Sequence, residues 1–277
     1  LFEASAYEEA LLAFSEILDK DKKHLYAHVN IALLLYRVGH FEKSIDYFDK
    51  SILLGADQPM VYYNLALCYS ELKQYKEANS YYKRLIDINK NDYEALYNLS
   101  LNQIALNLVD EAILGLKKTI TIQKDFLPAY KNLAILYAKN KMLDLSIDTF
   151  KQAVKLETKD KTIYENMANV YLIRFDYDGV IDIYSQYLNY FDGTSAIYND
   201  LGVAYLEKEN YSKALDNFKL AIEHKINFLP YYQNMVKLYS TTMYSPQKDE
   251  IRSFLKTAQL NNLDKEIKLL LQEIGIN

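Results

Sequence analysis

An asparagine recurs at a constant spacing of 34 residues through most of this chain. The positions are Asn30, Asn64, Asn98, Asn132, Asn166 and Asn234, with Asp200 where the series would place one more asparagine. Asparagine is a mediocre helix former, so its return at an interior helical position calls for a reason. Its amide offers one acceptor and two donors, which can hold the C=O and N–H groups of an extended peptide without reading side chains. The row therefore suggests recognition of a peptide backbone.

The asparagines belong to a 34-residue pattern that the chain repeats without insertion or deletion. Copies start at residues 25, 59, 93, 127, 161, 195 and 229. In each copy, slots 4, 7, 8 and 11 share one face of a first helix, and slots 20, 24, 27 and 28 share one face of a second helix. This spacing predicts antiparallel helical hairpins that bury their apolar faces against neighbouring copies.

The recurring residues resemble the tetratricopeptide repeat. Slot 7 reads Ile31, Leu65, Leu99, Leu133, Met167, Leu201 and Met235. Slot 8 is mostly small, slot 11 is mostly Tyr, and slot 24 is mostly aromatic. The resemblance implies an all-α, right-handed superhelical solenoid of tetratricopeptide-type hairpins with a C-terminal capping helix.

The whole chain, residues 1–277, is expected to form one solenoid domain. Residues 1–24 resemble a partial repeat, with a second helix over residues 6–19 and the stump of a first helix at Leu1 to Ala4, so we expect the natural protein to continue upstream. The expected segments are full repeats at 25–58, 59–92, 93–126, 127–160, 161–194 and 195–228, a degenerate repeat at 229–260 and a capping helix at 261–277. Ser245 and Pro246 are expected to open the last second helix, and Asn261 or Asn262 to cap the final helix.

The fifth copy departs from the pattern. Val180 and Tyr187 occupy slots 20 and 27, which are usually small, and Gly179 falls within the second helix. These residues predict a looser or bent junction in this copy.

In tetratricopeptide repeats the first helices line the concave wall, so the resemblance places the asparagine row on a ligand-facing surface. The row is similar to the asparagine ladder in the repeat region of O-linked N-acetylglucosamine transferases. Helices packed roughly 9–10 Å apart would space its rungs by about three residues of an extended chain at ~3.3 Å each. The candidate peptide-binding residues of this concave face are Asn30, Tyr63, Asn64, Tyr97, Asn98, Lys131, Asn132, Asn166, Asn169, Asn199, Asp200 and Asn234. The early wall is aromatic and apolar and the later wall mixes charges, which predicts a polarised groove.

Two other interpretations bear on this row. Its amides could bond the backbone of a neighbouring helix instead of a ligand, and the sequence leaves both roles open. A second familiar site is excluded, namely the two-carboxylate clamp that holds the acidic tails of heat-shock chaperones. Ile135, Ala196 and Asp200 stand where that clamp needs Asn, Lys and Arg, and an Asp would repel a carboxylate.

Catalytic and metal sites are not expected. The sequence contains no G-x-S-x-G, H-E-x-x-H, G-x-G-x-x-G or phosphate-loop motif, so we expect a protein that is not an enzyme and has no cofactor. His24 and His28 are four residues apart and could share a metal. However, His28 falls at slot 4 of its repeat and is expected in the core.

The composition argues against nucleic-acid binding and against a membrane span. The net charge is −5 with both signs interspersed, so the basic surface that nucleic acid requires is missing. The single cysteine, Cys68, excludes an internal disulfide framework and is expected to be a small buried side chain. No apolar run approaches the ~20 residues that span a bilayer. The expected compartment is the cytoplasm, although a chain that begins at Leu1 leaves room for a removed targeting segment.

We therefore expect a non-enzymatic adaptor that grips an extended or helical segment of a partner protein in its concave groove. One alternative is the substrate-recruiting region of a larger, glycosyltransferase-like enzyme whose catalytic domain is not in this chain. Another is a scaffold or self-association module, in which the exposed N-terminal helix stacks on another copy. A peptide-pheromone sensor is a narrower alternative that would need a DNA-binding domain elsewhere.

Overall fold

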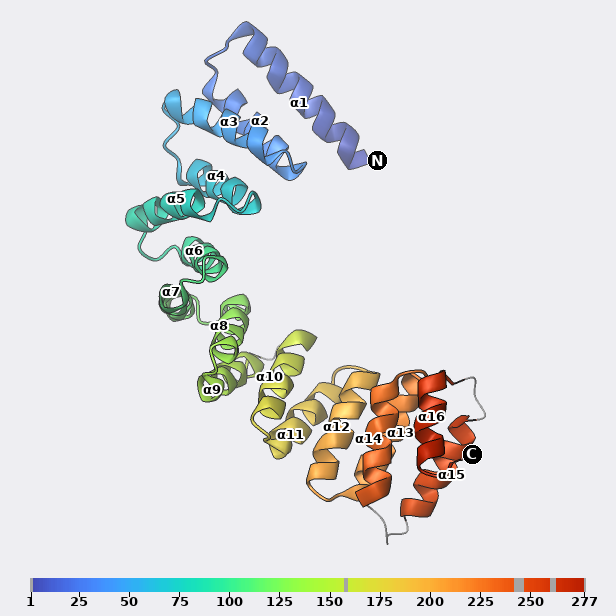
Figure 1. The fold of residues 1–277 in the computed structure, drawn as a ribbon. Coiled ribbons are helices and arrows are strands. Elements are labelled where there is room, and N and C mark those ends of the chain that lie inside the picture. The colour runs from blue at the N-terminus through green and yellow to red at the C-terminus, as the bar shows by residue number, and fades with distance from the viewer. Residues whose placement is uncertain (1, 157–158, 242–246, 260–262, 277) are drawn as a thin grey trace. The chain divides into compact units, whose positions relative to one another are not determined.

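The computed structural model describes residues 2–156, 159–241, 247–259 and 263–276, which form α-helices and connecting turns without any β-strand. In chain order the helices are α1 (Phe2–Lys20), α2 (Leu25–Arg37), α3 (Phe41–Leu53), α4 (Pro59–Glu71), α5 (Tyr75–Ile88), α6 (Tyr93–Ala105), α7 (Val109–Ile122), α8 (Leu127–Lys139), α9 (Leu143–Val154), α10 (Lys161–Ile173), α11 (Tyr177–Leu188), α12 (Ser195–Glu207), α13 (Tyr211–His224), α14 (Leu229–Thr241), α15 (Gln247–Gln259) and α16 (Lys265–Glu273) (Figure 1). The predicted all-α fold of helical hairpins is confirmed.

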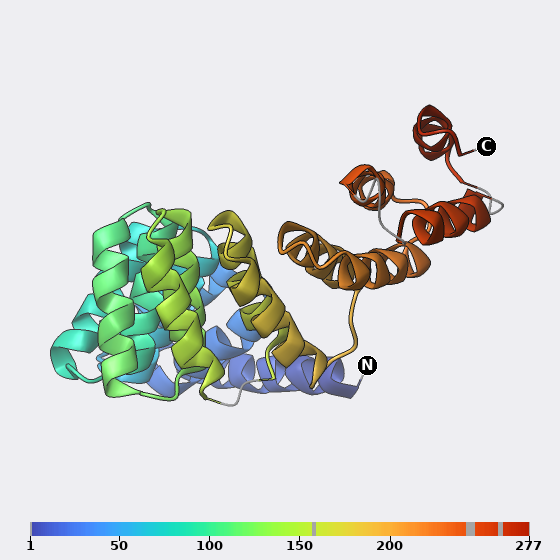
Figure 2. The same ribbon diagram turned by 90° about the horizontal axis from the view of Figure 1, so that it is seen from below.

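The chain divides within α8 into two compact units, residues 1–136 and 137–277. In the first unit, α1 packs on α2, and the hairpins α2/α3, α4/α5 and α6/α7 follow one another in chain order. In the second unit, the hairpins α10/α11, α12/α13 and α14/α15 do the same, and α16 packs on α14 at the end of the unit (Figures 1 and 2). Each unit is therefore built as a helical solenoid, in which a hairpin contacts only its neighbours.

Two expected boundaries are corrected. Helix α1 already includes Phe2, because residues 2–6 continue a helix-favouring sequence, so residues 2–4 belong to this helix and not to a separate first helix. The last helix begins at Lys265 with Asp264 at its N-cap, because Leu263 is buried in the core before the helix starts. The expected helix openings at Ser245–Pro246 and at Asn261 or Asn262 lie outside the described residues.

Small side chains let the paired helices approach closely. The alanines of slot 8, from Ala32 to Ala168, are fully buried, as are the aromatic rings of slot 24 at Phe48, Phe150 and Phe218. At Gly202 of slot 8, a Cβ atom would lie 2.5 Å from the ring of Phe218, so this slot has no room for a larger residue. Cys68 is also fully buried, as expected. The core is thus a series of small-to-aromatic contacts that the repeat renews in each hairpin.

The fifth copy keeps an unbroken second helix. Helix α11 continues through Gly179, where a Cβ atom would lie 2.4 Å from the ring of Tyr171. Val180 and Tyr187 are fully buried. Glycine at this position therefore makes room for a neighbouring aromatic ring without ending the helix.

Every hairpin from α2 to α13 turns through one residue in the left-handed conformation, always at slot 15. These residues are Gly39, Lys73, Asn107, Lys141, Phe175 and Glu209, with φ between 57° and 81°. Each lies two residues after the last residue of a first helix, just beyond the C-cap, where a left-handed residue commonly terminates an α-helix. Only glycine adopts this conformation without steric cost, and asparagine tolerates it.

The turn at Phe175 offers a test of this strain. Replacing Phe175 with Gly should raise the free energy of unfolding by about 1 kcal/mol, because the side chain is 76 % exposed and its φ of 59° is strained. Urea unfolding measures the change. The opposite substitution, Gly39→Ala at the equivalent turn, should lower the free energy of unfolding by a similar amount. A Phe175→Gly variant less stable than the wild type would contradict the strain argument.

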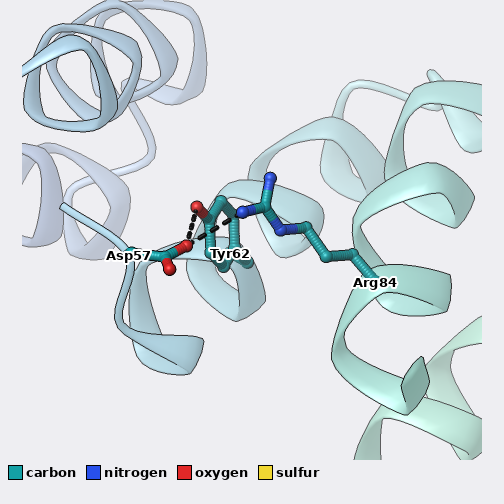
Figure 3. Close-up of polar contacts among 3 residues, drawn as sticks. All are labelled: Asp57, Tyr62 and Arg84. Atoms are coloured by element: carbon teal, nitrogen blue, oxygen red, sulfur yellow. Dashed lines mark hydrogen bonds and ion pairs between the residues drawn. The ribbon is translucent and has the colours of Figure 1, made fainter. Parts of the chain in front are cut away.

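A polar cluster connects the turn before α4 with α4 itself and with α5 (Figure 3). The Tyr62 hydroxyl donates to Asp57 Oδ1 at 2.6 Å, and Arg84 Nη2 donates to the same oxygen at 2.8 Å. The guanidinium of Arg84 also lies 4.0 Å from the centre of the Tyr62 ring. The hydrogen bond from Tyr62, with the charge of Arg84, holds the pKa of Asp57 below its usual value. The cluster joins three successive elements and has a structural role.

Candidate peptide-binding surface

The polar row predicted from the sequence lies on the first helices of the hairpins. In the first unit, Asn30, Asn64, Asn98 and Asn132 lie on α2, α4, α6 and α8 and are each half-buried. In the second unit, Asn166, Asp200 and Asn234 lie on α10, α12 and α14 and are also half-buried. Each side chain is thus partly reachable from solvent while part of it packs against the protein.

Three of the amides hydrogen-bond to the preceding repeat. Asn98 Nδ2 donates to the Tyr63 hydroxyl at 3.0 Å, and Asn132 Nδ2 donates to the Tyr97 hydroxyl at 2.8 Å. In the second unit, Asn234 Nδ2 donates to Asn199 Oδ1 at 2.8 Å. In each case slot 5 of one repeat meets slot 6 of the next, 35 residues later. This pairing was not predicted, although the constant separation of 35 residues is a signal that could have revealed it.

Three other amides turn back onto their own helix. Asn30, Asn64 and Asn166 each donate from Nδ2 to the carbonyl oxygen four residues earlier, at 2.7 to 2.8 Å. The amide donors in the row therefore have partners within the protein, either the backbone of their own helix or a side chain of the preceding repeat. These bonds fix the orientation of each amide. An amide also has a carbonyl oxygen and a second N–H with which it can bind a ligand.

The two tyrosines of the candidate surface are held in place by aromatic packing. Tyr63 lies edge-on to Tyr82, with ring centroids 6.1 Å apart, and Tyr97 lies edge-on to Phe126 at 5.0 Å. Burial raises the pKa of both phenols, and the hydrogen bonds from the asparagines only partly offset this. Both hydroxyls are therefore protonated at neutral pH, so each can also donate a hydrogen bond while it accepts one from an asparagine.

The remaining predicted residues differ in exposure and partners. Asn169 is exposed and Lys131 is half-buried. Asp200 accepts hydrogen bonds from the Tyr184 hydroxyl at 3.1 Å and from Asn199 Nδ2 at 3.4 Å. Burial raises the pKa of the Asp200 carboxyl, although these two donors lower it in part. Asp200 is thus the one acidic member of the row, and the donors that reach it are neutral.

Not every polar side chain on the first helices belongs to this surface. Asn102 on α6 is only 4 % exposed, and its Nδ2 donates to Ser70 Oγ at 3.0 Å. It also joins two repeats, but from within the interior. Asn102 therefore provides a buried counterpart to the half-buried Asn98 of the same helix.

The two histidines considered for metal binding have structural roles. His24 caps α2, with its Nδ1 accepting a hydrogen bond from the Ala27 N–H at 3.2 Å. His28 is buried as predicted, with its Nε2 at 2.9 Å from the Lys22 carbonyl oxygen. Within the part of the chain that the structure describes, no three His, Cys, Asp or Glu side chains are grouped to hold a metal ion.

Comparison with known protein families identifies the repeat. Models described as tetratricopeptide repeat match residues 59–92, 127–160 and 195–223. The chain is similar to the tetratricopeptide repeat over these segments. Each segment begins at the first residue of a helix, namely α4, α8 and α12. No curated protein matches this chain.

Several solved structures are similar in fold to this chain. A crystal structure of MamA is 22 % identical, with a TM-score of 0.53, and the match covers 56 % of this chain and 91 % of MamA. MamA from Desulfovibrio magneticus RS-1 is 19 % identical, with a TM-score of 0.54, and covers 57 % of this chain and 90 % of its own. A tetratricopeptide repeat protein from Parabacteroides merdae ATCC 43184 is 19 % identical, with a TM-score of 0.58, and covers 86 % and 93 %. At these identities the likeness concerns the fold.

Among the described helices, none has the length and apolar character needed to cross a bilayer. The tetratricopeptide fold generally serves as a non-catalytic scaffold for protein interactions.

Proposed function

We propose that this chain is a non-enzymatic interaction module that binds an extended or helical segment of a partner protein along its first helices. The observation that carries the proposal is the row of half-buried amides at one position of successive first helices, each oriented by a hydrogen bond inside the protein. Oriented amides are well suited to meet a peptide backbone, because little side-chain entropy remains to be lost on binding.

The first unit has the better-formed part of this surface. There Asn98 and Asn132 each donate a hydrogen bond to a tyrosine hydroxyl, and the tyrosines are themselves packed against neighbouring aromatic rings. The amide oxygens can accept hydrogen bonds from backbone N–H groups, and the tyrosine rings can pack on apolar side chains of the segment. We infer a contact similar to the asparagine ladder of O-linked N-acetylglucosamine transferases, confined to the backbone of the bound segment.

A double substitution of these amides tests the proposal. A peptide is first selected from a phage library of random dodecapeptides on the whole chain, and its dissociation constant is measured by fluorescence anisotropy. Changing Asn98 and Asn132 together to Ala should weaken binding by roughly 10- to 30-fold, because two backbone hydrogen bonds of about 1 kcal/mol each are lost. The urea midpoint should fall only slightly, since both amides are half-buried.

Asn102→Ala is the matched control on the same helix. It should lower the free energy of unfolding by about 1 kcal/mol, because the buried Asn102 amide and its hydrogen bond to Ser70 Oγ are lost, and leave peptide affinity unchanged. The proposal fails if the double variant binds the peptide normally and loses as much stability as Asn102→Ala. The amide row would then have a purely structural role.

Self-association through α1 is a second candidate function. Helix α1 exposes two apolar side chains, Leu12, which is 66 % exposed, and Ile17, which is 37 % exposed. Exposed apolar side chains on a helix with a neighbour on one side only favour contact with another chain. Light scattering over a range of protein concentrations distinguishes a dimer from a monomer.

A further inference from the structure

A cavity of about 470 Å³ lies between α1, α2 and α3 in the first unit. Its apolar walls are formed by Leu18, Leu53 and Leu54. Its polar lining consists of Asp19, Lys22, His28, Tyr47 and Lys50. The volume lies in the range of protein sites that hold small organic ligands. The asparagines of the candidate peptide-binding surface do not line this cavity, so a ligand bound here would be separate from the proposed peptide.

The next repeat shows which group fills the equivalent position. There Asp57 Oδ1 accepts hydrogen bonds from the Tyr62 hydroxyl at 2.6 Å and from Arg84 Nη2 at 2.8 Å (Figure 3). A carboxylate is thus held between an aromatic side chain at slot 4 and a cation at slot 26. The three residues that lie 34 positions earlier in the chain are Lys23, His28 and Lys50. The first copy therefore keeps a ring and a cation but has a lysine in place of the carboxylate.

The short side chain of His28 explains why the cavity forms in this copy. Five of the seven copies have tyrosine at slot 4. An imidazole is shorter than a phenol, so it leaves free the space that the outer part of a tyrosine fills elsewhere. In the next repeat the Arg84 guanidinium lies 4.0 Å from the centre of the slot 4 ring, whereas Lys50 Nζ lies 4.9 Å from the centre of a different ring, that of Tyr47.

The polar groups of the cavity have unused hydrogen-bonding capacity. His28 is 6 % exposed, and its Nε2 lies 2.9 Å from the Lys22 carbonyl oxygen. Its Nδ1 is buried without a hydrogen-bond partner among the described residues, which is uncommon in proteins and indicates room for a bound group. Neither Lys22 nor Lys50 forms an ion pair within the described part of the chain.

The chemistry of the lining fits an anion with an apolar body. Two ammonium groups, those of Lys22 and Lys50, and one carboxylate, that of Asp19, line the cavity, so positive charge is in excess even with a neutral His28. The ammonium groups supply donors to the oxygens of an anion. A protonated imidazole has two N–H donors, so His28 can donate to a carboxylate as Tyr62 does in the next repeat. The leucine walls would cover apolar atoms of the ligand.

We infer that this cavity binds a small organic acid, with its carboxylate near Lys22 and Lys50 and its apolar body against the leucine walls. The carboxylate of the ligand would take the part that Asp57 has in the next repeat. The inference goes beyond the proposed function, because it assigns a second ligand and a second site to the first unit.

Ligand-observed saturation-transfer NMR on the whole chain provides the first test. The probes are 3-phenylpropionate, 4-methylpentanoate and indole-3-acetate, each compared with its neutral amide. At least one acid should bind roughly 10-fold more tightly than its amide, because the amide cannot form charge-assisted hydrogen bonds with the lysines. The double variant Lys22→Gln/Lys50→Gln should remove this difference. Lys43→Gln is the matched control, since Lys43 lies on α3 outside the cavity and its replacement should leave both affinities unchanged.

A variant that rebuilds the cluster of Figure 3 provides the second test. It combines Lys23→Asp, His28→Tyr and Lys50→Arg, and the fold accommodates tyrosine at slot 4 in five other copies. The added ring and carboxylate should fill the cavity, so binding of the acid should be lost while the urea midpoint stays at or above the wild-type value. The single variant Lys23→Asp leaves His28 unchanged and should weaken binding roughly 10-fold, because its carboxylate competes with that of the ligand.

Three results would overturn the inference. The first is equal affinity for acid and amide, or no saturation transfer to any of the three acids. The second is full binding of the acid by the rebuilt variant, which would place the site elsewhere. The third is tighter binding of phenyl phosphate than of 3-phenylpropionate, which would show a phosphate site. None of these results bears on Asn98 and Asn132, so the proposed function is tested separately.

Discussion

Changing Tyr187 to Ala should lower the free energy of unfolding of this protein by about 3–5 kcal/mol, although small residues are usual at this slot of the repeat. The side chain is fully buried on α11. Its ring packs against Tyr164, Tyr184 and Phe191, with centroids 6.2, 6.4 and 4.9 Å away. Alanine would leave a cavity the size of a tyrosine ring among these three, and rigid helices cannot close it. Urea unfolding followed by circular dichroism measures the loss.

Tyr187→Phe is the matched control. The Tyr187 hydroxyl is buried without a hydrogen-bond partner among the described residues, so removing it should leave stability unchanged or raise it slightly. A Tyr187→Ala variant as stable as the wild type would show that α10 and α11 can close around the smaller residue. The aromatic cluster would then have no role in holding this hairpin together.

The second large effect is expected at alkaline pH, where the folded chain should unfold cooperatively between about pH 10 and pH 12. Burial raises the pKa of Tyr232 and of Tyr69 to about 12 each, and it raises the pKa of Tyr82 and Tyr184 further. The reference value in an unfolded chain is 10.0. Because the folded pKa lies above the unfolded one, the stability that these phenols provide is complete below pH 10 and is lost as the pH rises toward 12.

The size of this effect follows from the pKa difference. For the fully buried Tyr232, a rise from 10.0 to about 12 corresponds to about 2 kcal/mol of stability lost by pH 12. The measurement is far-ultraviolet circular dichroism together with the absorbance of tyrosinate during one pH titration. The two signals should change together, and Tyr232→Phe should move the midpoint to higher pH. Tyrosinate that forms fully before the helices unfold would contradict the prediction.

The amides of the candidate surface form hydrogen bonds inside the protein and are also the groups proposed to bind a peptide. Asn98 and Asn132 each donate to a tyrosine of the preceding repeat, so the amides that would meet a peptide also link neighbouring hairpins. Such coupling implies that changes in the row alter both affinity and stability, in proportions that depend on burial. For this reason the comparison of Asn98 with the buried Asn102 is informative, since the two share a helix and a residue type.

The sequence predicted the hairpins correctly because each hairpin is formed by residues that are close together in the chain. The 34-residue spacing, free of insertions, forces each copy to present the same slots to its neighbours, and the small and aromatic slots at Ala32 and Phe48 are buried as expected. Periodicity cannot place a helix end that depends on a distant contact. Helix α16 therefore starts later than expected, because the buried Leu263 holds the chain before it.

The sequence by itself determined the all-α hairpin repeat, its register and the position of an amide row on the first helices. The tertiary structure alone decided what each amide bonds, which conformation the turn residues adopt, and how Tyr187 is accommodated. Neither Lys73 nor Phe175 signals a left-handed turn by residue type, yet both adopt it because slot 15 ends the first helix. The physical reason is the separation in sequence between the residues that determine each feature. A helical period is set by neighbours three and four residues apart, whereas the contact between Tyr63 and Asn98 depends on how closely α4 and α6 are packed.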